Sequence, residues 1–116
     1  MLSAGQVLSA PRPWPSARVL PNDSPPEILA VSLNETTIAD GDRLIGRVAT
    51  STNVASLEVR TESFSFNAQR PAFGEFTFVQ HVLDMPPEYR RRYLLEFIAR
   101  NSAGMQARRY VPIRFR

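Results

Sequence analysis

Arg90, Arg91 and Arg92 stand in a row and form the most obvious candidate binding site in the sequence. Guanidinium groups bind phosphates, sulfates and carboxylates, so a run of three suggests contact with a polyanion or with an anionic partner. Acidic residues stand close by at Glu88 and Glu96, however, and arginines alternate with acids over most of the chain. We therefore favour a solvated or ion-paired loop at this position and keep polyanion binding as the weaker alternative.

Residue types that support catalysis or metal binding are sparse. His81 is the only histidine and the chain has no cysteine, which leaves neither a histidine–cysteine ligand set nor a cysteine nucleophile. Asp40 and Asp42 could offer oxygens to calcium, but calcium takes about six to eight of them, and Gly41 between the two makes a plain turn the simpler interpretation. Because no nucleophile, acid–base pair or ligand set can be assembled, we expect a protein that is not an enzyme and uses no cofactor or metal.

Aromatic side chains offer a second binding chemistry, the stacking of sugar rings or bases. Five phenylalanines fall within one stretch: Phe64, Phe66, Phe73, Phe76 and Phe78. Four of them have the two-residue spacing of a strand face and are expected in the core. Phe73 lies instead in a loop between two chain breakers, Pro71 and Gly74, and is expected to be an exposed contact residue. With Tyr89 and Tyr110 as further stacking residues, a carbohydrate- or surface-binding module is the first alternative function.

The composition indicates one globular domain without a membrane-spanning segment. Hydrophobic residues make up 43% and charged residues 22% of the 116 residues, and no apolar run reaches the roughly 18 residues that span a bilayer. The net charge is +3, from 14 positive and 11 negative residues, and every positive side chain is an arginine. So modest and interspersed an excess argues against nucleic acid as a partner, and arginine without lysine suggests a GC-rich bacterial source. No positive charge precedes Arg12, so no signal peptide is visible.

The first 26 residues differ from the rest because they hold six of the ten prolines. Proline favours extended, polyproline-like backbone, so residues 1–26 are predicted to be an arm or linker that precedes a domain at residues 27–116. One interpretation is a disordered leader. The alternative is a docking arm, in which Trp14 anchors the stiff segment on a neighbouring chain.

From Glu27 onward apolar residues recur at every second position, which is typical of half-buried strands. Seven segments show this pattern: residues 27–33, 42–50, 54–62, 63–67, 75–83, 92–100 and 108–115. The side chains expected to face the core in the first and third segments are Leu29, Val31 and Leu33, and Ala55, Leu57, Val59 and Thr61. Pro112 lacks the N–H of a central strand, so the last segment is expected at a sheet edge or beside a bulge. Seven strands without a sustained helical period predict an all-β, antiparallel two-sheet sandwich.

The stretch YLLEFIARNSAG, from Tyr93 to Gly104, resembles the penultimate strand of bacterial immunoglobulin-like and fibronectin-III-like modules. The segments at 27–29 and 39–42 are similar to the opening strand and first turn of that family. The chain departs from antibody-type domains because it lacks their two cysteines and the tryptophan of their third strand. The resemblance implies a non-catalytic structural or interaction subunit of a bacterial envelope or surface assembly, outside the cytoplasm, whose partners are other protein subunits or copies of itself. The residues expected to contact partners are Trp14, Phe73, Tyr89, Arg90, Arg91 and Arg92.

Overall fold

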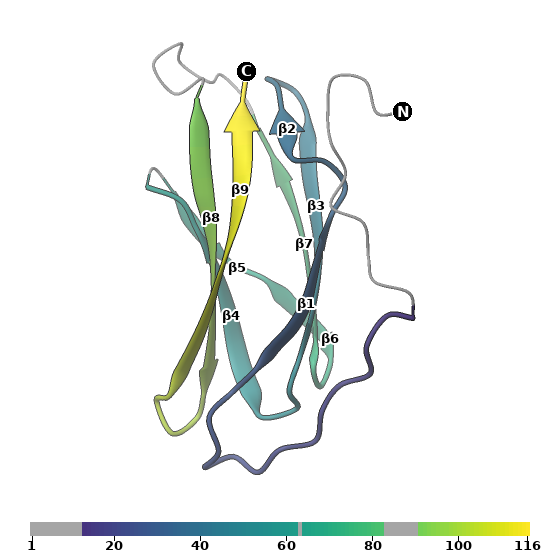
Figure 1. Cartoon of the computed structure of the whole chain (residues 1–116), viewed down its shortest axis with the longest axis vertical. Helices are drawn as coiled ribbons and strands as arrows, with labels where there is room; N and C mark the ends of the chain where they lie inside the picture. Colours follow the sequence, from purple (N-terminus) through teal and green to yellow (C-terminus); the bar gives the residue numbers. More distant parts are fainter. Residues whose placement is uncertain (1–12, 63, 83–90) are drawn as a thin grey trace.

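In the computed structural model, residues 13–62, 64–82 and 91–116 are described, and they form two β-sheets packed face to face (Figure 1). One sheet has four strands in the order β1-β3-β7-β6, and the other has five in the order β2-β9-β8-β4-β5. The strands are β1 (Ile28–Leu33), β2 (Thr37–Ile38), β3 (Arg43–Thr50), β4 (Val54–Arg60), β5 (Ser65–Asn67), β6 (Gln69–Ala72), β7 (Glu75–His81), β8 (Arg92–Asn101) and β9 (Gln106–Phe115). The described residues contain no helix, so the predicted all-β, two-sheet architecture is confirmed.

The strand count and the pairing differ from the prediction of seven antiparallel strands. The described residues form nine strands. The two that the prediction missed are β2 and β6, whose polar and turn-forming residues indicated loops. β2 has only two residues and pairs with β9 in parallel. β6 contains Pro71, which is tolerated because β6 lies at the edge of its sheet and pairs with β7 alone.

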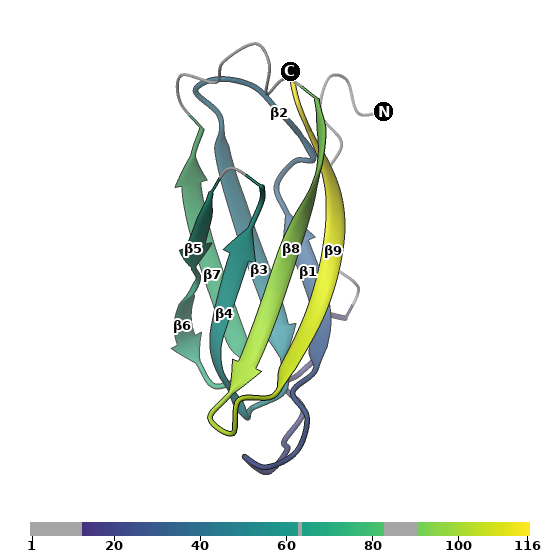
Figure 2. The same cartoon turned by 90° about the vertical axis from the view of Figure 1, so that its left-hand side faces the viewer.

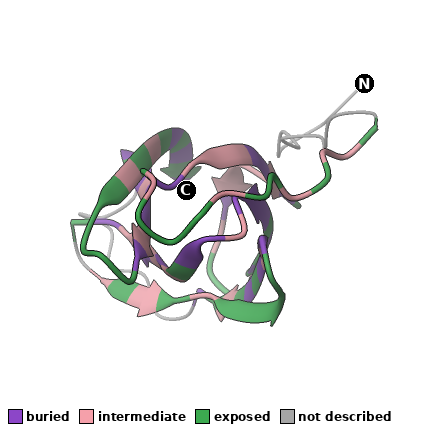
Figure 3. Ribbon diagram, turned by 90° about the horizontal axis from the view of Figure 1, so that it is seen from below, coloured by how far each residue is buried: buried purple, intermediate pink, exposed green. Residues whose placement is uncertain are grey.

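The core lies between the two sheets and is built from side chains that alternate along the strands. Figure 3 shows the buried residues on the strands of both sheets and exposed residues on the connecting loops. The buried inward residues of β3, β7, β8 and β9 are Leu44, Val48, Phe76, Phe78, Tyr93, Leu95, Phe97, Ala99, Val111, Ile113 and Phe115. The two-residue alternation of buried side chains therefore holds along these four strands.

Of the residues predicted for the core, Phe64 and Phe66 are only partly buried and pack against it, and two others do not lie in it. Ala55 is exposed and Val54 is buried instead, because a β-bulge between Val54 and Ser56 shifts the alternation at the start of β4. Leu29 is only partly buried and lies outside the core, because a register shift interrupts the pairing of β1 with β3 next to this residue. A bulge adds one residue to one strand, and strict two-residue counting cannot detect it.

Gly46, near the centre of β3, makes room for the ring of Phe78 on the neighbouring strand of the same sheet. It lies opposite Phe78 of β7, and a Cβ atom at position 46 would lie 2.1 Å from Cε1 of the Phe78 ring. The ring covers the glycine and reaches Phe66 and Phe97, with ring centres 5.2 and 6.2 Å away. Glycine is thus the residue that fits here, because any side chain would overpack the core.

β9 is not the edge strand that Pro112 predicts, because β2 lies beyond it in the sheet, but β2 pairs only with Arg114 and Phe115 and does not reach Pro112. The N–H groups of Arg114 and Arg116 donate to the carbonyls of Thr36 and Ile38, next to and in β2. Two residues earlier, the nitrogen of Pro112 faces the same side of β9, beyond the two residues of β2 that pair with it. The missing donor therefore leaves no strand hydrogen bond unmade.

The described part of the arm lies against its own sandwich (Figure 1). The guanidinium carbon of Arg47, on β3, lies 4.4 Å from the centre of the Trp14 ring. The arm then passes the turn between β6 and β7, where Gly74 has a left-handed φ of 78° and leaves room for Ala17. Residues 1–12 lie outside the described part of the chain, so the predicted arm is described only from Pro13 onward.

Two buried asparagines fasten the arm at the lower end of the sandwich. The side-chain amide of Asn53 donates to the carbonyls of Pro21 and Ser24, at 3.1 and 2.7 Å. The amide of Asn101 donates to the carbonyls of Asn22 and Ser24, at 3.2 and 2.8 Å. Both asparagines are only 5% exposed, so side chains satisfy arm carbonyls that have no strand partner. We call Asn53 and Asn101 the asparagine clasp.

Candidate binding surfaces

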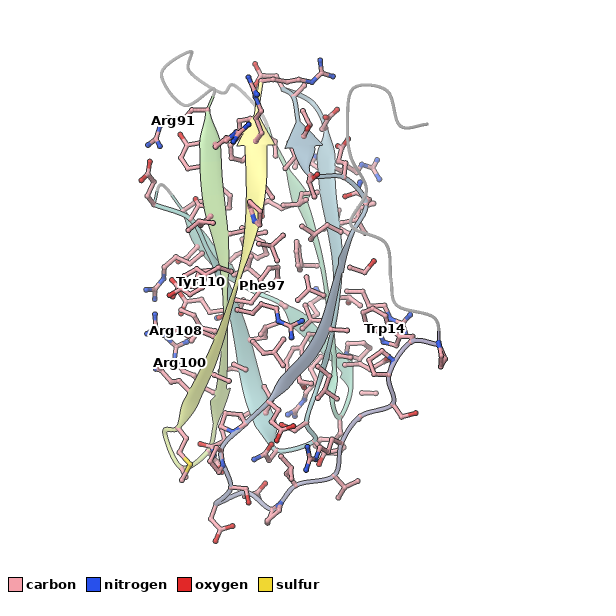
Figure 4. The ribbon with its side chains drawn as sticks, in the orientation of Figure 1. Trp14, Arg91, Phe97, Arg100, Arg108 and Tyr110 are labelled. Carbon is pink, nitrogen blue, oxygen red and sulfur yellow. The ribbon has the colours of Figure 1, made fainter. Side chains whose placement is uncertain are left out.

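The consecutive arginines Arg91 and Arg92 point to different places. The Arg91 guanidinium lies 4.4 Å from the centre of the Tyr93 ring and forms an ion pair with Glu62 (Figure 4). Arg92 begins β8 and points to the outer face of the five-stranded sheet, because its neighbour Tyr93 points into the core. Arg90 lies outside the described residues.

Arg92 instead joins residues from two other strands. It lies opposite Arg114 in the pairing of β8 with β9, and Arg114 lies opposite Thr37 of β2. These three residues cross the upper end of the sheet, where β8 begins in Figure 1, and we call them the upper arginine row. The guanidinium groups of Arg92 and Arg114 have no ion-pair partner among the described residues. Like charges that face each other across a ladder lower stability, so the row is unusual for a purely structural feature.

An exposed apolar band lies next to the upper arginine row. Leu94 is 59% exposed and lies opposite Pro112, which is exposed as well. Figure 2 shows β4, β8 and β9 side by side in this sheet, and the band lies near the start of β8 and the end of β9. The row also borders a shallow hollow of about 300 Å³ whose lining residues are Thr36, Thr37, Arg92, Pro112, Ile113 and Arg114. The hollow therefore has two positive and no negative side chains in its lining.

The lower half of the same face carries arginines that are ion-paired (Figure 4). Glu58 of β4 pairs with Arg60 and Arg100, each at 2.8 Å. Glu96 of β8 pairs with Arg108 of β9 and also accepts a hydrogen bond from the hydroxyl of Tyr110, on the same strand as Arg108. We call these five charged residues the paired network.

The paired network covers an apolar side chain. Ile98 lies between Glu58 and Arg108 on the neighbouring strands, and it alternates with inward residues, so it points outward. It is nevertheless fully buried, although it is not part of the core between the sheets. Long charged side chains bury apolar surface with their aliphatic stems, and this explains how Ile98 is covered.

The contacts of the paired network set the acidity of its carboxylates. Hydrogen bonds from Arg100 and Arg60 lower the pKa of Glu58. Burial acts to raise the pKa of Glu96, but hydrogen bonds from Arg108 and from the tyrosine hydroxyl outweigh it, and the pKa is lowered. Both carboxylates are therefore held in the ionised form.

The pKa of Glu35, between β1 and β2 at the upper end, is shifted in the opposite direction. Burial raises its pKa and the negative charge of Asp42 adds to the effect, whereas the positive charge of Arg116 acts to lower it. Glu35 does not line the hollow beside the upper arginine row.

The outer face of the four-stranded sheet is half covered by the arm. Ala30 and Ala49 lie opposite each other and are buried although they are not part of the core, because the arm crosses the lower half of this face. No described residue of the arm covers the upper half. There Ile45 and Val79 lie opposite each other on β3 and β7, and they are 43% and 60% exposed. Both line a hollow of about 370 Å³, and Val79 lines a second one of about 310 Å³ on its other side.

Phe73, at the turn between β6 and β7, is 70% exposed, as expected of a loop contact residue. The guanidinium carbon of Arg70 lies 4.9 Å from its ring centre, and the same guanidinium donates to the carbonyl of Val54 at 3.3 Å. One face of the Phe73 ring is therefore covered by Arg70, which a hydrogen bond to the backbone holds in place. Tyr89, the other predicted stacking residue in a loop, lies outside the described part of the chain.

Sequence reasoning missed Arg114 because it treated the arginines of each strand separately. Arg108 lies opposite Ile98, and it is Arg114 that lies opposite Arg92. The signal that could have found Arg114 was the turn centred on Ala103, because equal counting on both sides of it pairs Arg114 with Arg92.

Comparisons with protein families, with curated proteins and with solved structures give no match for this chain. Within residues 13–62, 64–82 and 91–116, no three His, Cys, Asp or Glu side chains gather as a metal-binding group. The same residues include no helix that could cross a membrane.

Proposed function

We propose that this chain is a non-catalytic interaction module with an immunoglobulin-like topology. The strand order supports the topology, because β1-β3-β7-β6 corresponds to the A-B-E-D sheet of an immunoglobulin constant domain and β9-β8-β4 to its G-F-C sheet. β2 then continues the first strand after it crosses to the other sheet, and β5 extends the G-F-C sheet at its far edge. The sequence resemblance supports the same assignment and a setting in an extracytoplasmic bacterial assembly.

The observation that carries the proposed function is the open half of the β3–β7 face. Val79 and Ile45 are neighbours there, and exposed apolar residues that adjoin hollows mark protein-binding surfaces more often than isolated ones do. The covered half of the same face already packs against an extended segment, the arm of this chain, through Trp14 and Arg47. A partner segment in extended conformation would continue this packing upward, with Val79 as its central contact.

Site-specific photo-crosslinking tests this function. A photoreactive residue at position 79 should form one defined crosslinked species in the cells that make the protein, and a crosslink between two copies would identify the partner as a second copy. The matched control position is Ser102, which is exposed in the turn between β8 and β9. Val79→Glu should abolish the complex without unfolding the domain, whereas Gln106→Glu should not. Equal crosslinking at 79 and 102, or a complex that survives Val79→Glu, would contradict the proposal.

A second candidate function, carbohydrate binding, is supported by Phe73. Its ring is exposed on a rigid turn, and the face away from Arg70 is available for a sugar ring. A glycan array with the intact protein tests this function. Binding that Phe73→Ala removes would favour it over the interaction module, and the absence of any binding would count against it.

A further inference from the structure

The upper arginine row lies on the sheet opposite the β3–β7 face and does not depend on the function proposed for that face. Its central feature is the direct opposition of Arg92 and Arg114 across β8 and β9, without an acidic partner among the described residues. On the lower half of the same face, by contrast, the arginines form ion pairs with Glu58 and Glu96. A like-charged pair is stabilised when an anion binds between the two guanidinium groups, each of which can donate two parallel hydrogen bonds to an oxyanion.

The surroundings of the row indicate what kind of anion fits. The hollow beside it is shallow and is bordered by the apolar Pro112, with Leu94 exposed in the next row. Below that band lies Glu96, whose negative charge is already paired. A nucleic acid or another long polyanion that followed the strands would meet first an apolar band and then a carboxylate. A ligand with one or two negative charges next to an apolar group matches the surface better.

We propose that the upper arginine row binds a carboxylate of an extended acidic segment of a partner protein. The carboxylate lies between Arg92 and Arg114, with Thr37 at the side of β2, and an apolar side chain next to it in the segment lies on Leu94 and Pro112. The hollow is too open to enclose a small molecule, so recognition depends on the two charges and on the adjoining apolar contact.

Titrations of the intact chain followed by NMR test the site, with three probes: sodium sulfate, a synthetic peptide of alternating Glu and Val, and a single-stranded oligonucleotide. The peptide should shift the backbone signals of Thr37, Arg92, Leu94 and Arg114 together. Arg92→Gln and Arg114→Gln should each weaken peptide binding at least tenfold. Arg43→Gln, which removes an exposed arginine from the other sheet, is the matched control and should leave binding unchanged.

Stability without a ligand gives an independent readout. Because Arg92→Gln removes one of two opposed charges, it should raise the midpoint of thermal unfolding at low salt, and added salt should shrink the difference. Peptide or sulfate should raise the midpoint of the natural chain more than that of the variant.

Three results would overturn the proposal. They are peptide shifts that persist in both arginine variants, equal weakening by Arg43→Gln, and tighter binding of the oligonucleotide than of the peptide. The last result would instead establish a polyanion site. Val79→Glu should not change peptide binding, so failure of this site and failure of the interaction proposed for the β3–β7 face can be told apart.

Discussion

On the lower half of the five-stranded sheet, Glu58 holds Arg60 and Arg100 in ion pairs, whereas Arg92 and Arg114 face each other at the upper end without an acidic partner among the described residues. The two regions share one sheet face and one residue type. In the lower region the charged groups satisfy one another and cover an apolar residue. In the upper region the charges are available to a ligand. We propose that arginine on this sheet packs where a carboxylate lies within reach and binds a ligand where no described carboxylate does.

The two ends of the molecule also differ in how far the arm covers the four-stranded sheet. At the lower end the asparagine clasp satisfies the carbonyls of the arm, and the arm covers half of the four-stranded sheet. At the upper half of that sheet Ile45 and Val79 remain exposed. The lower end is therefore expected to supply stability and the upper end to supply binding, and the following predictions test this division.

The largest effect is expected from the clasp. Asn101→Ala removes two donors to arm carbonyls and the acceptor of the Met105 N–H, and it leaves buried polar groups unsatisfied. We expect a loss of about 2 to 4 kcal/mol in the free energy of unfolding, measured by chemical denaturation. Asn67→Ala is the control, because Asn67 is exposed on β5 and should change stability by less than about 0.5 kcal/mol. Equal losses from the two substitutions would show that the clasp does not stabilise the fold.

A smaller effect is expected where the arm passes the turn between β6 and β7. Gly74 and Gly104 both have a positive φ, 78° and 85°, but only Gly74 is crowded: a Cβ there would lie 2.3 Å from that of Ala17. Gly104→Ala should lose about 1 to 2 kcal/mol from backbone strain alone, and Gly74→Ala about 1 kcal/mol more from the clash.

The single tryptophan reports whether the arm is displaced in these variants. Trp14 packs on Arg47, so its fluorescence should shift to longer wavelength in Gly74→Ala and stay unchanged in Gly104→Ala. A Gly74→Ala protein with the emission and stability of Gly104→Ala would mean that the arm does not depend on this contact.

The smallest effects are expected from single carboxylates, and they have opposite signs in the two regions. The pKa of Glu58 is lowered, so its ionised form stabilises the fold above the unfolded pKa of about 4.3, and this stability is lost as pH falls through the folded pKa. The pKa of Glu35 is raised, so its contribution is complete below about 4.3 and is lost as pH rises through the folded pKa.

At pH 7, Glu58→Gln should therefore be less stable than the natural chain and Glu35→Gln more stable. Both differences should vanish in acid, that of Glu58→Gln below its folded pKa and that of Glu35→Gln below about 4.3. Urea unfolding at several pH values measures them. Variants that change stability in the same direction at pH 7 would remove the contrast between the regions.

Much of the fold could be read from the sequence because burial imposes a two-residue period on a strand. That period placed Phe76, Phe78, Leu57 and Val59 in the core and Phe73 outside it. It failed at Ala55, because a bulge changes the count without changing the composition. It also could not separate short strands from turns, so β2 and β6 were missed.

The candidate sites were harder to predict, because each depends on residues that the chain brings together from a distance. The run at 90–92 is a cluster in the sequence, yet in the structure Arg91 forms an ion pair with Glu62 and Arg92 lies opposite Arg114 of another strand. The clasp residues read as turn formers, since nothing local shows that their amides reach the arm.

The sequence by itself determined which faces of the strands are apolar and that the sandwich is all-β, because the hydrophobic period acts locally. Only the tertiary structure decided which arginines have partners, where the arm lies and which apolar residues stay exposed. Those outcomes depend on the register between strands, and register joins Arg92 to Arg114 and Glu58 to Arg100 across distances that no local pattern encodes.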